Sequence, residues 1–166
     1  MNDNKIKDMT LNAMFMALVI IGTLVIKIPT VTGGNINLGD TVIFIAAFLL
    51  GGLRGGIAGG IGASLADLLG GHYSFVFATL FIKFAEGLVA GFVFSEIKNK
   101  TAASFSASAV GGAVMVFGYF IYEYFALSPG IALSVFVPNI LQAVICAALT
   151  VIIYPLAVGG KKKKIR

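Results

Sequence analysis

The chain of 166 residues is 58% hydrophobic and only 11% charged, whereas an ordinary soluble domain is roughly one-quarter charged. This balance excludes an ordinary soluble domain and predicts an integral membrane protein, with room for six apolar spans of about 20 residues and little else. The net charge of +5 does not indicate nucleic-acid binding, because five of the twelve cations fall in the run KKKKIR and no basic face with interleaved aromatic residues exists outside the apolar stretches.

The long apolar stretches predict an all-α bundle of six transmembrane helices, in a single domain covering residues 1–166. The expected spans are about 9–28, 40–53, 55–69, 74–95, 105–125 and 131–157. Pro29 is expected to close the first span, and Arg54 marks a tight turn between the second and the third. Pro138 is expected to bend the sixth span or to delay its start.

Between the expected spans, lysine and arginine occur only in every second gap. They are Lys5, Lys7, Arg54, Lys98, Lys100, Lys161, Lys162, Lys163, Lys164 and Arg166. The gaps around 29–39, 70–74 and 126–130 contain none. Because cytoplasmic loops of membrane proteins retain Lys and Arg, the pattern predicts an even number of crossings with both termini in the cytoplasm.

Small residues recur at four-residue spacing in the second and third spans. The two series are Gly51, Gly55, Gly59 and Ala63, and Gly52, Gly56 and Gly60. Such spacing lets helix backbones approach closely in lipid, so it predicts that the second and third spans form a close-packed hairpin, with a moving surface as the alternative. The stretch GGLRGG lacks the Gly-Lys-Ser/Thr ending of a phosphate-binding loop, so the sequence offers no visible means of hydrolysing ATP.

Polar side chains occur inside the expected spans, where each is costly unless it is paired or hydrated. They are Asp67, Lys83, Glu86, Glu123, Asn139 and Gln142. Lys83 and Glu86 are three residues apart on one helix and are expected to form an ion pair, either structural or facing a ligand. Asn139 and Gln142 share a face in the same way and either bond a neighbouring helix or line a site.

Three helices are expected to carry polar and aromatic groups to one level in the outer half of the bilayer. At 1.5 Å per residue, Lys83 and Asn139 lie about 13 Å, and Tyr119 about 9 Å, from the outer ends of their helices. Tyr122 and Glu123 extend this polar edge on the fifth span. An apolar cavity with a few convergent polar groups is typical of a small-molecule site, and a flat heteroaromatic ligand would suit it.

Three polar residues near the outer ends have simpler interpretations. His72 has no second His or Cys spaced to join it, so it does not predict a metal site; it is either an interfacial surface residue or part of a pocket lid. Asp40 is expected to cap the N-terminus of the second span rather than to bind a ligand. Asp67 caps a helix, pairs with a neighbour or faces the cavity.

The stretch NLGDTVIFIAAFLLGGLRGGIAGGIGASLADLLGG, followed by ATLFIKFAEGLVAG, resembles the S components of energy-coupling factor (ECF) vitamin transporters. GYFIYEYF and VPNILQAVI are similar to the fifth and sixth spans of the riboflavin-transporter-like group, which includes hydroxymethylpyrimidine and pyridoxine types. The resemblance implies a pocket near the outer face and a covering loop, here 29–39, with Gly33, Gly34 and Asn35 in its gating part.

The same resemblance implies partners in a prokaryotic plasma membrane, namely a membrane T component and two cytosolic ATPases. Ala13 and Ala17 match the small-residue pattern that contacts the T component, unless they pack within the chain. The expected function is therefore a vitamin-binding subunit, without catalytic residues or a cofactor, for hydroxymethylpyrimidine or pyridoxine. The expected substrate-binding residues are Lys83, Tyr119, Tyr122, Glu123, Asn139, Gln142, His72 and Asp67.

Two transport alternatives remain open at this point. A riboflavin-specific S component is the first, although the absence of Trp departs from several vitamin-binding relatives. The second is a self-contained proton-coupled carrier that uses Glu86 or Glu123 as its proton site. An intramembrane enzyme is disfavoured, because the sequence shows no paired catalytic acids, metal cluster or supported Ser/His dyad.

Overall fold

The structure, a computed structural model, describes residues 3–25, 27–29 and 35–162. Its helices and strands are α1 (Asp3–Leu24), β1 (Lys27–Pro29), β2 (Asn35–Asn37), α2 (Gly39–Leu50), α3 (Gly52–Leu69), α4 (Val76–Glu96), α5 (Lys100–Ala126) and α6 (Pro129–Lys162). The helices follow the order of the expected spans. The two short strands were not expected.

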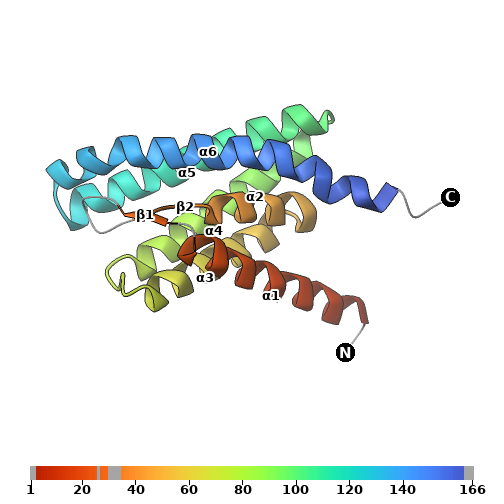
Figure 1. The fold of residues 1–166 in the computed structure, drawn as a ribbon, viewed down its shortest axis with the longest axis horizontal. Coiled ribbons are helices and arrows are strands. Elements are labelled where there is room, and N and C mark those ends of the chain that lie inside the picture. Colours follow the sequence, from red (N-terminus) through yellow and green to blue (C-terminus); the bar gives the residue numbers. More distant parts are fainter. Residues whose placement is uncertain (1–2, 26, 30–34, 163–166) are drawn as a thin grey trace.

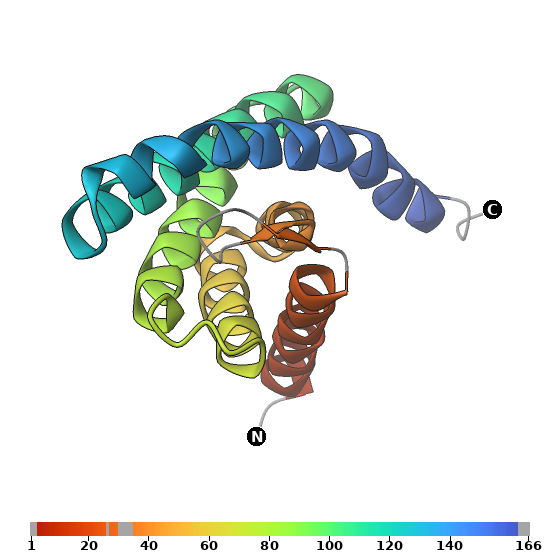
Figure 2. The ribbon, with the colours of Figure 1, turned by 60° about the vertical axis from the view of Figure 1, so that its left-hand side comes forward.

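The helices form two groups, a long antiparallel pair and a more compact set of four. α5 packs along α6, and this pair crosses over one side of the set formed by α1–α4 (Figures 1 and 2). Figure 1 shows both termini toward the right-hand end of the molecule, with the β-hairpin and the 70–75 turn toward the left-hand end. Successive loops therefore lie at opposite ends of the bundle, as expected. The number of membrane crossings stays a prediction.

The lengths and composition of the helices are those of a membrane protein. α1, α4, α5 and α6 are long and apolar enough to cross a bilayer, and α2 is apolar but has only 12 residues. Large apolar side chains also face outward, among them Phe77, Phe81 and Phe92 of α4, each at least 65% exposed. Exposed apolar area on this scale marks contact with a membrane or a partner. The expected all-α membrane fold is therefore confirmed.

The first helix ends earlier than the sequence suggested, and the chain then forms a β-hairpin. α1 ends at Leu24 rather than near residue 28, and β1 pairs antiparallel with β2, with Lys27 opposite Asn37 and Ile28 opposite Ile36. The expected boundary near residue 28 was therefore wrong, and Lys27 lies in the segment between α1 and α2 rather than in the first span.

Two further boundaries differ from the expectation. α6 begins at Pro129, where a proline needs no intrahelical donor, and it continues through Pro138, so the delayed start was wrong. The turn between α2 and α3 lies at Gly51, whose φ of 92° favours glycine. Arg54 belongs to the first turn of α3 and pairs with Asp8 of α1 over 2.6 Å.

The glycines of α3 bring its backbone against that of α4. A Cβ added at Gly52, Gly56 or Gly60 would lie 2.5–2.7 Å from a backbone carbonyl oxygen of α4, closer than real Cβ atoms approach. α4 returns the contact through Gly87 and Gly91, which face the backbone of α3. The other series faces α2, because a Cβ added at Gly55 would lie 2.4 Å from Cα of Ala47. The expected close packing of the second and third spans is therefore confirmed, whereas the close contact between α3 and α4 was not expected.

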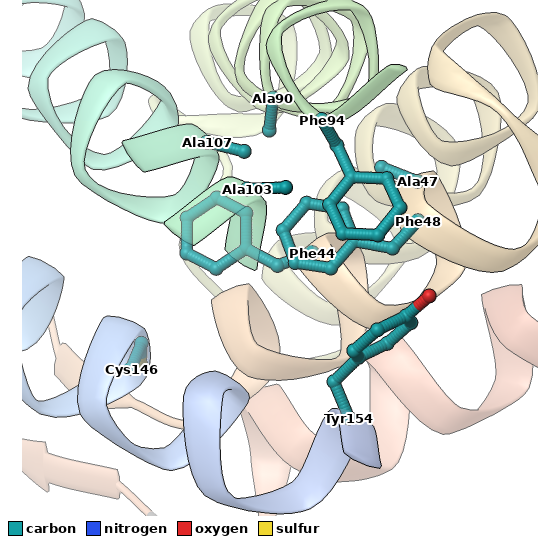
Figure 3. Close-up of a cluster of buried hydrophobic side chains, with 9 residues drawn as sticks. All are labelled: Phe44, Ala47, Phe48, Ala90, Phe94, Ala103, Ala107, Cys146 and Tyr154. Atoms are coloured by element: carbon teal, nitrogen blue, oxygen red, sulfur yellow. The ribbon is translucent and has the colours of Figure 1, made fainter. Parts of the chain in front are cut away.

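Aromatic packing joins α2, α4 and α6 (Figure 3), with Phe48 and Phe94 near the C-terminal ends of α2 and α4. The rings of Phe48 and Phe94 stack with centroids 4.2 Å apart, and Tyr154 meets both rings edge-on. Such contacts contribute beyond the burial of area. This cluster fixes the three helices at one end, and the polar side chains of the same helices gather toward the other.

Candidate small-molecule binding site

A cavity lies at the hairpin end of the bundle, between α1, the β-hairpin, α3, α4, α5 and α6. It holds about 620 Å³ of space between protein atoms, including the part that is open to the outside. Seven of the eight expected binding residues line it, and they are Asp67, His72, Lys83, Tyr119, Glu123, Asn139 and Gln142.

Tyr122 is the expected residue that does not line the cavity. Its hydroxyl donates a hydrogen bond to the carbonyl oxygen of Ser74, and its ring meets that of Phe75 edge-on at 5.5 Å. Phe75 itself lines the cavity. Tyr122 therefore holds Ser74 and Phe75 of the 70–75 turn in place, and through Phe75 it supports the wall of the cavity.

The expected gating loop is described only at its ends. Gly33 and Gly34 lie outside the described residues, and Asn35 is the first residue of β2. The hairpin nevertheless reaches the cavity, because Lys27 of β1 and Asn37 of β2 both line it.

A buried group of three charges lies at the inner side of the cavity. The Lys83 ammonium donates a hydrogen bond to Oδ1 of Asp40, and it lies 3.0 Å from Oε2 of Glu86. All three side chains are at most 4% exposed. The expected Lys83–Glu86 ion pair is confirmed, and one cation is shared between two carboxylates.

The role expected for Asp40 was wrong. Leu38 occupies the N-cap position of α2, and its side chain makes no capping hydrogen bond; Asp40 belongs to the first turn of the helix. Its carboxylate points into the protein, toward Lys83 of α4 and Gln142 of α6. The sequence separations of 43 and 102 residues left no local signal for these contacts.

Gln142 connects this buried charge group to the hairpin. Its Nε2 donates to Oδ2 of Asp40 over 2.8 Å, and its Oε1 accepts from the backbone N–H of Asn37 over 2.9 Å. These two partners, an acceptor and a donor, fix the orientation of the amide. The Nε2 and the Oε1 of Gln142 can each make one further hydrogen bond, to a ligand.

An aromatic wall and an acidic group complete the cavity. The Lys83 ammonium lies 5.6 Å from the centre of the Tyr119 ring, whose hydroxyl is 2.9 Å from Oγ1 of Thr79. Glu123, on the next turn of α5, is 4% exposed, and its Oε2 has no hydrogen-bond partner among the described residues. A buried acceptor without a partner is costly, so a ligand N–H group would be favourable here.

Sequence reasoning missed several lining residues, notably Lys27, Asn37 and Phe75. A signal existed for Asn37, whose Oδ1 accepts from the N–H of Gly39 in an Asn-Leu-Gly turn. Lys27 was hidden by the overlong first span. Within the described ranges, no group of three His, Cys, Asp or Glu residues could hold a metal ion.

The two small residues expected to contact a partner lie on the outer surface of α1. Ala13 and Ala17 are both exposed, and the neighbouring Met14 and Leu18 are 48% and 41% exposed. Ala13 and Ala17 are therefore not small because they pack against other described residues of this chain.

A family model described as "ECF-type riboflavin transporter, S component" matches residues 3–158. A protein of Lactococcus lactis subsp. cremoris (strain MG1363), named thiamine precursor transporter HmpT, is 33% identical over 158 residues, which cover 94% of this chain and 90% of that protein. A Pyrococcus woesei protein described as an "Uncharacterized protein in gap 3'region" is 39% identical over 127 residues, covering 76% of this chain and 84% of its own length.

Proposed function

Because the chain belongs to the family of ECF-type riboflavin transporter S components, we propose that it is the subunit that binds a vitamin precursor of the hydroxymethylpyrimidine class for import. The observation that carries the proposal is the cavity at the hairpin end, where an aromatic wall and polar groups from α4, α5 and α6 converge. The similarity to a thiamine precursor transporter over 94% of the chain supports this ligand class over riboflavin.

The polar groups of the cavity suit an aminopyrimidine with a hydroxymethyl arm. A flat ring can stack on Tyr119, whose ring already lies near Phe75, with centroids 6.5 Å apart. The exocyclic amino group can donate to Oε2 of Glu123, which has no hydrogen-bond partner among the residues that the structure describes. Ring nitrogens and the hydroxyl group can bond to the amides of Asn139 and Gln142, each of which offers donors and acceptors.

The family supports a complex with a membrane T component and two ATPases, in the cell membrane of a prokaryote. The chain itself acts as a binding subunit, and ATP hydrolysis belongs to the partners. The exposed Ala13 and Ala17 on α1 supply a smooth helix surface for the T component, because small side chains allow helices to approach closely in lipid.

Calorimetric titration of the purified protein with hydroxymethylpyrimidine, pyridoxine and riboflavin tests the ligand class. We expect the pyrimidine to bind most tightly. Glu123→Gln removes a charged acceptor and Asn139→Leu removes an amide, and each is expected to weaken binding about ten- to hundredfold. Glu96→Gln is the matched control, because Glu96 is an exposed carboxylate at the C-terminus of α4.

Two results would contradict the proposal in different ways. Unchanged affinity in folded Glu123→Gln and Asn139→Leu variants would place the site elsewhere. Tight binding of riboflavin without measurable binding of the pyrimidine would leave the site in place and overturn the ligand class.

A further inference from the structure

Asp40 is a buried charge beside the cavity, although it does not line the cavity itself. It is 1% exposed, and both of its carboxylate oxygens are engaged. Its two partners, Lys83 and Gln142, do line the cavity. Asp40 thus contacts two side chains of the proposed ligand site, on two different helices.

Through Gln142, Asp40 also acts on the hairpin. The Gln142 amide lies between Asp40 and the backbone N–H of Asn37, and Asn37 is the register partner of Lys27 in the hairpin. If the amide rotated by half a turn, its NH₂ group would face the Asn37 N–H and its oxygen would face the Asp40 carboxylate. Both contacts would then be repulsive, so Asp40 selects the orientation that holds β2 against α6.

We infer that Asp40 is a positioning residue, which orients Lys83 and Gln142 toward the cavity and fastens the β-hairpin to α6 through the Gln142 amide. The ligand side of this inference rests on the proposed function, whereas the hairpin side does not. Asp40 therefore couples the inner wall of the cavity to the segment that forms its outer edge.

Glu86 provides a matched comparison within the same charge group. It also pairs with Lys83 and is fully buried, but neither of its oxygens has a hydrogen-bond partner among the described residues, Gln142 included. Glu86→Gln and Asp40→Asn each remove one carboxylate charge beside Lys83. Only Asp40→Asn removes the charged acceptor that orients Gln142.

Hydrogen–deuterium exchange of the ligand-free protein, followed by mass spectrometry, tests the hairpin side. In Asp40→Asn we expect amides of residues 35–39 to exchange about ten- to hundredfold faster, as the loss of a charge-assisted hydrogen bond implies. In Glu86→Gln the same peptide is expected to keep the native rate. Equal rates in both variants, or an unchanged rate in Asp40→Asn, would overturn the inference.

A second variant covers the case in which Asp40→Asn does not fold. Gln142→Met keeps the Asp40–Lys83 ion pair and removes the amide that joins Asp40 to Asn37, so it should also speed exchange at residues 35–39. If both variants fold, their effects should not add, because they break one connection. Native exchange in Gln142→Met, or fully additive effects, would refute the role assigned to Asp40.

Ligand affinity gives a separate readout. Asp40→Asn is expected to weaken binding of hydroxymethylpyrimidine about tenfold, since Gln142 would no longer be held in one orientation. If the native protein did not bind this compound, the proposed ligand would be wrong while the exchange result would still decide the inference. If the native protein bound it and Asp40→Asn bound it equally well, Asp40 would have no positioning role toward the ligand.

Discussion

The buried charge group makes an asymmetric prediction about stability. Lys83 is the cation shared by Asp40 and Glu86, and all three side chains are at most 4% exposed. Lys83→Met leaves two buried carboxylates without a cation, and breaking a buried pair in this way typically costs about 3–5 kcal/mol. Glu86→Gln leaves the Lys83–Asp40 pair intact and leaves no uncompensated charge, so we expect a cost below about 1 kcal/mol.

The buried Cys146 provides the assay. It is the single cysteine of the chain and is fully buried, so a thiol-reactive fluorescent dye reports unfolding as the thiol becomes accessible. For a chain of this size, the expected loss in Lys83→Met corresponds to a decrease of roughly 6–20 °C in the midpoint of unfolding. Glu86→Gln should lower the midpoint by less than about 4 °C.

A surface ion pair supplies the control for these values. Asp8 pairs with Arg54 over 2.6 Å, but both side chains are 42% exposed, and such pairs contribute about 0–1 kcal/mol. Asp8→Asn should therefore behave almost like the native protein. A larger loss of stability in Glu86→Gln than in Lys83→Met would refute the assignment of Lys83 as the shared cation.

Three further predictions concern helix packing, assembly and topology. Gly56→Ala places a Cβ 2.7 Å from a backbone oxygen of α4, and we expect the free energy of unfolding, followed by the dye assay, to fall by about 1–3 kcal/mol. Gly130→Ala is the control and should be neutral, because open space surrounds Gly130. Equal effects of the two substitutions would contradict the close packing of α3 against α4. Ala17→Trp should abolish uptake and co-purification with the T component, yet leave ligand affinity within about threefold; normal ATP-dependent uptake would exclude this surface. In an otherwise cysteine-free chain, Ser128→Cys should react with an impermeant reagent outside intact cells and Lys100→Cys should not, whereas labelling of Lys100→Cys would overturn the predicted topology.

Features that depend on local spacing were predictable from the sequence. The four-residue glycine series predicted close helix packing, and the three-residue interval between Lys83 and Glu86 predicted their ion pair. The depth of the polar residues along their helices predicted that Tyr119 and Asn139 lie at one level, and both line the cavity. Each of these follows from helix geometry alone.

Features that depend on contacts between distant segments were not predictable in this way. Asp40 reaches Gln142 across 102 residues, and its place in a first helical turn equally suggested a simple cap. The hairpin was missed because apolar residues continue past Leu24, and hydropathy does not distinguish the end of a helix from a short strand. Lys27 was misplaced for the same reason.

The unequal lengths of the helices have a consequence for the surrounding lipid. At 1.5 Å per residue, the 27 residues of α5 and the 34 residues of α6 extend about 40 and 51 Å, whereas the 12 residues of α2 extend about 18 Å. The hydrocarbon layer is about 30 Å thick, so α5 and α6 exceed it, whereas α2 falls short. Helices longer than the hydrocarbon layer are accommodated by tilting. Bilayer thickness should therefore affect the inclination of α5 and α6 in the membrane, and with it the direction in which the cavity opens.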